Sequence, residues 1–243
     1  MKEIKYLFLV FFFITQMSIA QKNPESTELW EPSPAKVTSG EIGLPPSDAI
    51  VLFNGGNLSN FESVDGSKAN WTVLNDILTI NPEAQSIKTK QKFGDSQLHI
   101  EWSVPIDDIN QGQSKGNSGI FLMERYEIQI LDSWENTTYS NGQAASVYKQ
   151  HIPLVNASKK PGEWQSYDII FIAPRFNKSG GIISPSKLTV FHNGVLVHYN
   201  VSLLGTTEFI GMPVYKSHGD KEPLMIQNHG APVRFKNIWI REL

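Results

Sequence analysis

The chain has 243 residues, a formal net charge of −3 and no cysteine. The absence of cysteine excludes disulfides, a lipid anchor on cysteine, a thiol nucleophile and thiolate metal sites. The small net charge, without any basic run, argues against nucleic acid and anionic membranes as partners.

The first segment, residues 1–20, has the pattern of a secretory signal peptide. Lys2 and Lys5 give it a positive start, the run 6–14 is apolar, and small residues precede the expected cut. The apolar run is shorter than the ~20 residues that a spanning helix needs. We therefore expect a secreted, periplasmic or cell-surface protein of a Gram-negative bacterium, with no membrane span once the signal is removed.

Residues 21–47 contain five prolines and few apolar side chains, which predicts an extended N-terminal arm. The remaining residues, 48–243, are long enough to form one domain with a sizeable core.

Short strands dominate the rest of the sequence, with turns at Gly, Asn and Pro. Hairpins are predicted with turns at Asn75-Asp76, near Glu124-Arg125 and at Asn193-Gly194. The strand-forming segments are 49–53, 70–80, 96–104, 118–131, 164–174, 187–203, 223–230 and 233–243. This pattern predicts an all-β fold, a jelly-roll β-sandwich of two curved antiparallel sheets rather than a closed barrel.

The stretch "YEIQILDSW" places Glu127, Gln129 and Asp132 at E-x-Q-x-x-D spacing inside a strand. The spacing is similar to the E-x-D-x-x-E strand of jelly-roll β-glucanases, whose two carboxylates act as nucleophile and acid/base. Glu127 and Gln129 share one face of a regular strand, and Asp132 joins them only through a β-bulge. A solvated outer face is the alternative interpretation.

Other polar residues come from distant segments. His99 and Glu101 share one face of their strand, and Asn117 with Ser118 precedes a buried strand. Gln227 and His229 follow a late strand, and a histidine beside carboxylates suits a general base. We expect one polar groove that contains Glu101, Glu127, Gln129, Gln227 and His229.

A divalent metal ion stays open as a cofactor, because nitrogen and oxygen ligands are available without any compact metal-binding motif. The residues of these types are His99, Glu101, Glu127, Asp132 and His229.

Four stretches together resemble the 3-keto-disaccharide hydrolase domain family, over about Ala49 to Leu243. They are "GNSGIFLMERYEIQILDSW", "NGQAASVYKQHIPLVNASKKPGEWQSYDIIFIAPRF", "LTVFHNGVLVHYNVSL" and "PLMIQNHGAPVRFKNIWIREL". The resemblance implies a concanavalin-A-like jelly roll that acts on small carbohydrates whose C3 has been oxidised by a separate sugar dehydrogenase.

The resemblance also implies the site residues. His229 or Glu127 is expected as base, with Glu101 as partner acid or metal ligand. Asn228 stands where the family pattern has an acid. The residues expected to bind substrate are Asn117, Ser118, Gln129, Asp132, Tyr148, Lys149 and Gln227.

A ketone at C3 acidifies the proton at C2, so one base can start β-elimination of the group on C1, and water can then add back. Three functions follow from the sequence. They are a 3-keto-glycoside hydrolase, a conventional two-carboxylate glycoside hydrolase, and a carbohydrate-binding module without turnover.

Overall fold

The computed structural model describes residues 24–243, so the expected signal peptide lies outside the described residues. The chain divides into two units, which meet between Val37 and Thr38. The described part of the first unit begins with the short 3-10 helix η1 (Pro24–Thr27) and continues without regular secondary structure. Its Leu29 and Trp30 side chains are exposed.

Residues 38–47 of the predicted arm belong to the second unit. The carbonyl oxygen of Gly43 accepts hydrogen bonds from Asn237 Nδ2 (2.6 Å) and Trp239 Nε1 (3.1 Å). This part of the arm is therefore attached to the domain that follows it.

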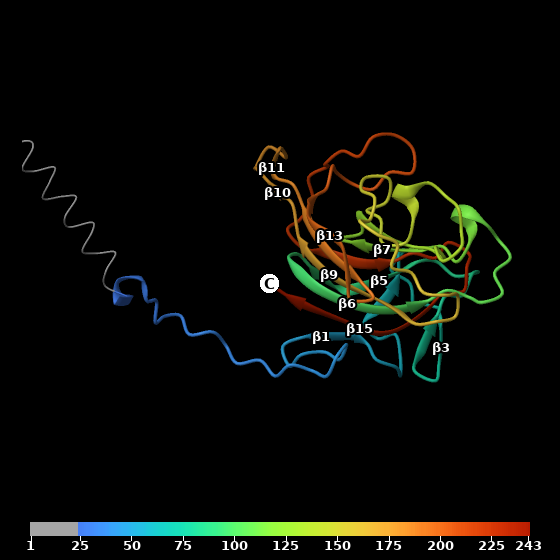
Figure 1. Cartoon of the computed structure of the whole chain (residues 1–243), viewed down its shortest axis with the longest axis horizontal. Helices are drawn as coiled ribbons and strands as arrows, with labels where there is room; N and C mark the ends of the chain where they lie inside the picture. The colour runs from blue at the N-terminus through green and yellow to red at the C-terminus, as the bar shows by residue number, and fades with distance from the viewer. Residues whose placement is uncertain (1–23) are drawn as a thin grey trace, which may run out of the picture. The chain divides into compact units, whose positions relative to one another are not determined.

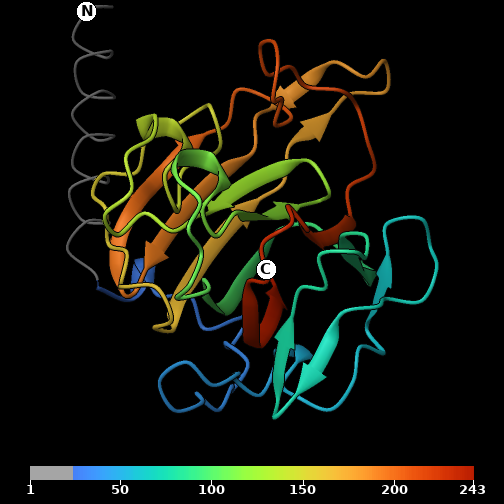
Figure 2. The ribbon, with the colours of Figure 1, turned by 90° about the vertical axis from the view of Figure 1, so that its right-hand side faces the viewer.

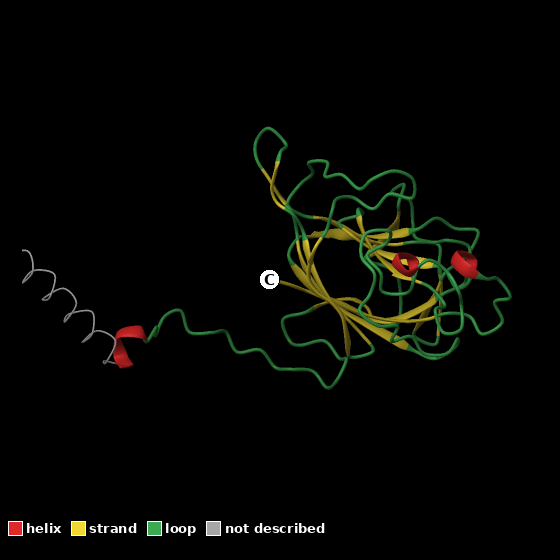
Figure 3. Cartoon of the chain, turned by 45° about the horizontal axis from the view of Figure 1, so that its top comes forward, coloured by secondary structure: helices red, strands yellow, loops and turns green. Residues whose placement is uncertain are grey.

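The second unit is built from two antiparallel sheets, which form two layers of strands (Figures 1 and 3). The eight-stranded sheet has the order β13 (Val195–Ser202), β12 (Lys187–His192), β9 (Gln165–Ile172), β6 (Ser96–Ser103), β15 (Arg234–Glu242), β4 (Ile77–Thr79) and β3 (Thr72–Leu74), with β1 (Ile50–Phe53) also paired to β15. The five-stranded sheet has the order β2 (Phe61–Ser63), β5 (Ile87–Phe93), β14 (Glu222–Ile226), β7 (Ser118–Leu122) and β8 (Tyr126–Ile130).

Smaller elements complete the second unit. They are the two-stranded ribbon β10 (Arg175–Phe176) and β11 (Ile182–Ser184), and the 3-10 helices η2 (Gly112–Ser114) and η3 (Ser140–Gly142). Figure 2 shows the C-terminal strand β15 in dark red beside the teal hairpin of β3 and β4, and β15 pairs with β4 and β6. The predicted jelly-roll β-sandwich is confirmed.

Turn chemistry explains the hairpins. Asn75 and Asp76 have φ of 50° and 59°, and Asn193 and Gly194 have φ of 53° and 78°, as a two-residue type I′ turn requires. The predicted turn near Glu124-Arg125 is confirmed: it spans residues 123–125, and its positive φ values fall on Met123 and Glu124.

The core lies between the sheets, and it fixes which way each strand faces. Tyr126 of β8 packs on Phe171 of β9, with ring centroids 5.7 Å apart, and the Tyr167 hydroxyl donates to the carbonyl oxygen of Gln129 (2.8 Å). Because side chains alternate along a strand, Glu127 points away from the eight-stranded sheet. In β6 the fully buried Ile100 points inward, so its neighbours point to the opposite outer face of the sandwich.

Candidate active site

Glu127 is at the centre of the polar cluster on the outer face of the five-stranded sheet. Its side chain and that of Gln129 are almost completely buried, at 4% and 1% exposure. Gly119 lies beside them on β7, paired with Gln129. A methyl group on Gly119 would lie 2.4 Å from Glu127 Oε1, so glycine leaves the space that this carboxyl group occupies.

The surroundings of Glu127 favour its neutral form. Burial raises the pKa of the Glu127 carboxyl to about 8. Among residues 24–243, no lysine or arginine forms an ion pair with it. With its amide nitrogen turned toward the carboxyl group, Gln129 donates to Glu127 Oε1 (3.1 Å) and to the carbonyl oxygen of Ser118 (3.2 Å). The amide therefore fixes the position of a carboxyl group whose pKa lies near neutral pH.

Tyr148 reaches the same face from a segment that runs along the free edge of β8. Tyr148 N donates to the Glu127 carbonyl oxygen (3.3 Å), and Val147 forms a bridge with Ile128 on the core side. Tyr148 therefore shares the face of Glu127. Its pKa is raised by burial, by a hydrogen bond with Tyr139 (2.7 Å between the hydroxyl oxygens) and by the nearby Glu127. The hydroxyl group thus keeps its proton and can donate it in a hydrogen bond.

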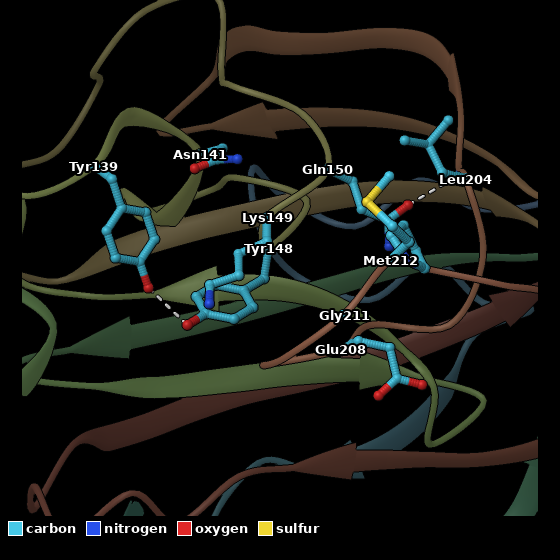
Figure 4. Close-up of a pocket in the computed structure, with 10 residues that line it drawn as sticks. Tyr139, Asn141, Tyr148, Lys149, Gln150, Leu204, Glu208, Gly211 and Met212 are labelled. Atoms are coloured by element: carbon cyan, nitrogen blue, oxygen red, sulfur yellow. Dashed lines mark hydrogen bonds between the residues drawn. The ribbon is translucent and has the colours of Figure 1, made fainter.

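A hollow of about 380 Å³ opens beside Tyr148 (Figure 4). Lys149 lines it, with φ of +57° and its ammonium group 4.3 Å from the Phe209 ring centroid. The other lining residues are Tyr139, Asn141, Gln150, Leu204, Glu208, Gly211, Met212 and Pro213. The structure thus brings together Glu127, Gln129, Tyr148 and Lys149 from the predicted set.

Asn117, Ser118 and Gln227 lie at the neighbouring ends of β7 and β14. The Ser118 hydroxyl donates to the Gln227 carbonyl oxygen (2.7 Å), and Gln227 N donates to the Gly119 carbonyl oxygen (2.9 Å). The Asn117 amide donates to the carbonyl oxygen of Gln113 (2.5 Å). Ser118 and Asn117 are buried and use these bonds to shape the backbone.

Asp132 follows β8 and does not extend the Glu127 row. Its Oδ2 lies 3.0 Å from Lys115 Nζ, and its Oδ1 accepts from Trp134 N (3.2 Å). The Asp132 side chain therefore joins the loop before β7 to the loop after β8.

Glu101 lies on the opposite outer face, so the predicted convergence of Glu101 with Glu127 does not occur. Its carboxylate pairs with Lys236 (3.1 Å) and accepts from Asn237 (2.8 Å). Burial raises the pKa of Glu101, but the bonds from Asn237 and Lys236 outweigh burial and lower it. His99 stacks on Trp239 on this same outer face. Strand alternation therefore places His99 and Glu101 together on the side of the core that is opposite to Glu127.

His229 is exposed and lines another hollow, of about 470 Å³, with Asp107 and Asp108. The preceding Asn228 has a structural explanation for being an amide. Its Nδ2 lies 3.0, 3.2 and 2.6 Å from the carbonyl oxygens of residues 81, 82 and 84. A carboxylate could not donate those bonds.

Comparison with known proteins identifies the family. A family model described as the 3-keto-alpha-glucoside-1,2-lyase-like domain matches residues 48–241. The chain belongs to this family. The predicted family resemblance is therefore confirmed, and membership supports a carbohydrate-active enzyme of the glycosidase type.

Solved structures agree with this 3-keto-alpha-glucoside-1,2-lyase-like domain. A candidate glycosyl hydrolase from Parabacteroides distasonis ATCC 8503 is 49% identical, with a TM-score of 0.87, over 91% of this chain and 97% of that one. A second from the same organism is 18% identical, with a TM-score of 0.60, over 81% and 94%, and supports the fold alone. The comparison with curated proteins gives no match.

The predicted metal ligands of this family member do not form one site. Within residues 24–243, no three His, Asp or Glu side chains are grouped so that they could hold a metal ion. His99 and Glu101 lie on the opposite side of the core from Glu127. In the same described part, no helix is long and apolar enough to cross a bilayer.

Sequence reasoning missed Gly119, Tyr139 and the loop that carries Met212. Gly119 was visible only as part of the "GNSG" turn, although it provides space for Glu127 on the neighbouring strand. Tyr139 and Met212 have no local pattern that marks them, because long loops bring them to the hollow.

Proposed function

We propose that this protein cleaves glycosides whose sugar ring carries a ketone at C3. The observation that carries the proposal is the buried Glu127 carboxyl group, with a pKa raised to about 8, beside the hydroxyl group of Tyr148. A base whose pKa lies near the working pH is the kind that proton abstraction beside a ketone needs. The family match supports the same substrate class.

The proposed reaction has two stages. Ionised Glu127 takes the C2 proton, and the electron pair of the C2–H bond becomes the C1=C2 double bond. The C1–O bond breaks, and the leaving oxygen takes its electron pair and a proton. Water then adds to the enone, with hydroxyl to C1 and a proton to C2, so the net change is hydrolysis.

Each neighbour of Glu127 has a role in this proposal. Gln129 is a positioning residue, because its amide contacts Glu127 Oε1 and fixes the carboxyl group. Tyr148 donates a hydrogen bond to the C3 oxygen, on which negative charge develops as the C2 proton leaves. Its raised pKa supports this role, since the hydroxyl group keeps its proton at working pH.

The cellular setting belongs to the same proposal. A dehydrogenase that oxidises the C3 hydroxyl group of a glycoside must supply the substrate. The pattern of residues 1–20 supports export, so that both steps take place in the periplasm, at the cell surface or outside the cell.

The conventional two-carboxylate mechanism fits this geometry poorly. It requires two carboxyl groups on either side of one glycosidic bond, ~5–9 Å apart. Glu101 and Glu127 point outward from opposite faces of the sandwich, and the core lies between them.

A matched pair of substrates tests the proposal. Methyl α-glucoside and its 3-keto form are each incubated with the protein, and methanol release is measured. We expect release only from the 3-keto form. Release from the unoxidised glucoside would contradict the proposal, and release from neither would favour a binding module without turnover.

A further inference from the structure

The loop between β13 and β14 presents apolar side chains to solvent. Residues 206–213, named here the 206–213 loop, close on themselves where Thr206 N donates to the Val214 carbonyl oxygen (3.1 Å). Gly205 allows this close approach, because a methyl group there would lie 2.5 Å from the Val214 backbone. Ile210 and Met212, at the tip, are 83% and 78% exposed. Neighbouring exposed apolar side chains indicate a binding surface.

The 206–213 loop is attached to the strand that carries the carboxyl group. Thr207 N donates to the Arg125 carbonyl oxygen (2.9 Å), and Glu127 N donates to Thr207 Oγ1 (3.0 Å). Lys149 Nζ donates to the Phe209 carbonyl oxygen (2.5 Å). The loop is therefore held beside the Glu127 face at three points.

Met212 of this loop and Tyr148 line the same hollow (Figure 4). Tyr148 also neighbours Glu127, since its N–H donates to the Glu127 carbonyl oxygen (3.3 Å), so the hollow and the reacting residue share Tyr148 as a neighbour. Tyr139 adds a second ring, with its centroid 6.3 Å from that of Tyr148. Leu204 adds an aliphatic wall.

The charged groups of the hollow already have partners. Lys149 is bound to the Phe209 carbonyl oxygen and lies over its ring. Glu208 pairs with Lys216, 3.6 Å away. The Gln150 amide is also engaged, since it donates to the Gly205 carbonyl oxygen (3.0 Å) and accepts from Leu204 N (2.7 Å). The remaining lining is two aromatic rings, aliphatic side chains and the Asn141 side chain, and most of it suits a neutral, apolar ligand.

We propose that this hollow binds the leaving group of the glycoside, and that it selects neutral leaving groups with a flat apolar ring. The inference rests on the proposed function, since it places the bond to be cleaved beside Glu127 and the leaving group beside Tyr148. The ring packs between Tyr139 and Met212. A polar sugar in the same position would leave these apolar surfaces in contact with hydroxyl groups.

Binding of unoxidised glucosides tests the inference without turnover. Phenyl α-glucoside and methyl α-glucoside are titrated into the protein by calorimetry, and only the leaving group differs between them. We expect the phenyl compound to bind ~10-fold more tightly, as burial of an additional ~60 Å² of apolar surface predicts. Met212→Ser should reduce that preference to about 3-fold, by the same area argument.

Ile210→Ser is the matched control, because Ile210 is equally exposed on the same loop but does not line the hollow. It should leave the phenyl preference unchanged. Equal binding of both glucosides by the unchanged protein would overturn the inference. So would an equal loss of preference in both variants.

Sedimentation with phosphatidylcholine vesicles checks another occupant of the loop. We expect no vesicle binding, and binding that Ile210→Ser abolishes would overturn the inference in favour of a lipid surface. A phenyl preference without turnover of any 3-keto-glycoside would remove the proposed function and leave the binding site standing. Turnover of a 3-keto-glycoside without a phenyl preference would support the proposed function and overturn the proposed binding site.

Discussion

Glu127 and Glu101 are the same residue type on two strands of one sandwich, yet their surroundings are opposite. Glu127 is 4% exposed and has an amide and a phenol as neighbours, so burial raises its pKa to about 8. Glu101 has a lysine and an asparagine as partners, and its pKa is lowered. A carboxylate that already has a cation is a poor base, whereas a buried one without a cation suits proton transfer.

The largest expected effect separates the two carboxyl groups by activity. Glu127→Gln should lower kcat on a 3-keto-glycoside by at least ~10³-fold, within the range for loss of a general base. Glu101→Gln should change kcat by less than about 3-fold, because a charge on the opposite outer face of the sandwich has little influence on the reacting group. Steady-state kinetics and circular dichroism of both variants check this, and equal losses would contradict the comparison.

Tyr148→Phe should have the next largest effect, a loss of ~10²-fold in kcat. It removes one hydrogen-bond donor to the developing oxyanion and keeps the ring. Tyr139→Phe is the control, since it removes the hydroxyl partner of Tyr148 but no proposed substrate contact, and it should cost under ~10-fold. A larger loss from Tyr139→Phe than from Tyr148→Phe would reverse the assignment.

Gly119→Ala tests whether the position of Glu127 matters. The added methyl group would lie 2.4 Å from Glu127 Oε1, so the carboxyl group must move. We expect a ~10-fold lower kcat/KM. We also expect the free energy of unfolding to fall by ~1–3 kcal/mol, as for overpacking of a buried site. Gly219→Ala is the control, because its methyl group would lie 3.2 Å from the end of the flexible Glu222 side chain and at ordinary contact distance, 3.5 Å, from the Lys221 carbonyl oxygen. Unchanged kinetics for Gly119→Ala would show that the close contact is unimportant.

The two carboxyl groups should also differ in how their contributions to stability depend on pH. The folded pKa of Glu127, about 8, is above its ordinary 4.5, so its contribution to stability is complete below pH 4.5 and lost as pH rises toward 8. Urea unfolding should therefore show the free energy of unfolding of Glu127→Gln rising relative to the unchanged protein across that window, by on the order of 5 kcal/mol.

Glu101→Gln should show the opposite sign. The pKa of Glu101 is lowered, so its contribution is present above pH 4.5 and is lost as pH falls below it. The same urea experiment at pH 3 to 5 measures this difference. Parallel pH curves for the two variants would mean that the two carboxyl groups have similar surroundings in the folded protein.

The sequence predicted the sandwich because its main signals are local. Alternation identified β6 and β9, and Asn-Gly and Asn-Asp pairs identified two hairpins. It missed β5, whose "IKTKQKF" has lysines at alternate positions on the outer face, and the three-residue β2. These strands are set by pairing with β14 and with each other rather than by their own composition.

The candidate site was predictable only in part. Glu127 and Gln129 were found because they interrupt a strand whose other side is core, and Tyr148 and Lys149 came from the family resemblance. The sequence could not say which outer face Glu101 occupies, because alternation gives two faces per strand and the pairing of strands into sheets decides which sheet each one joins.

Solvent exchange at C2 tests the central claim most directly. A 3-keto-glucoside is incubated in D₂O, and deuterium at C2 of the recovered sugar is measured by NMR for the unchanged protein, Glu127→Gln and Glu101→Gln. The account predicts deuterium at C2 with the unchanged protein and with Glu101→Gln, and none above the uncatalysed rate with Glu127→Gln. Full exchange by Glu127→Gln, or its loss in Glu101→Gln alone, would contradict it.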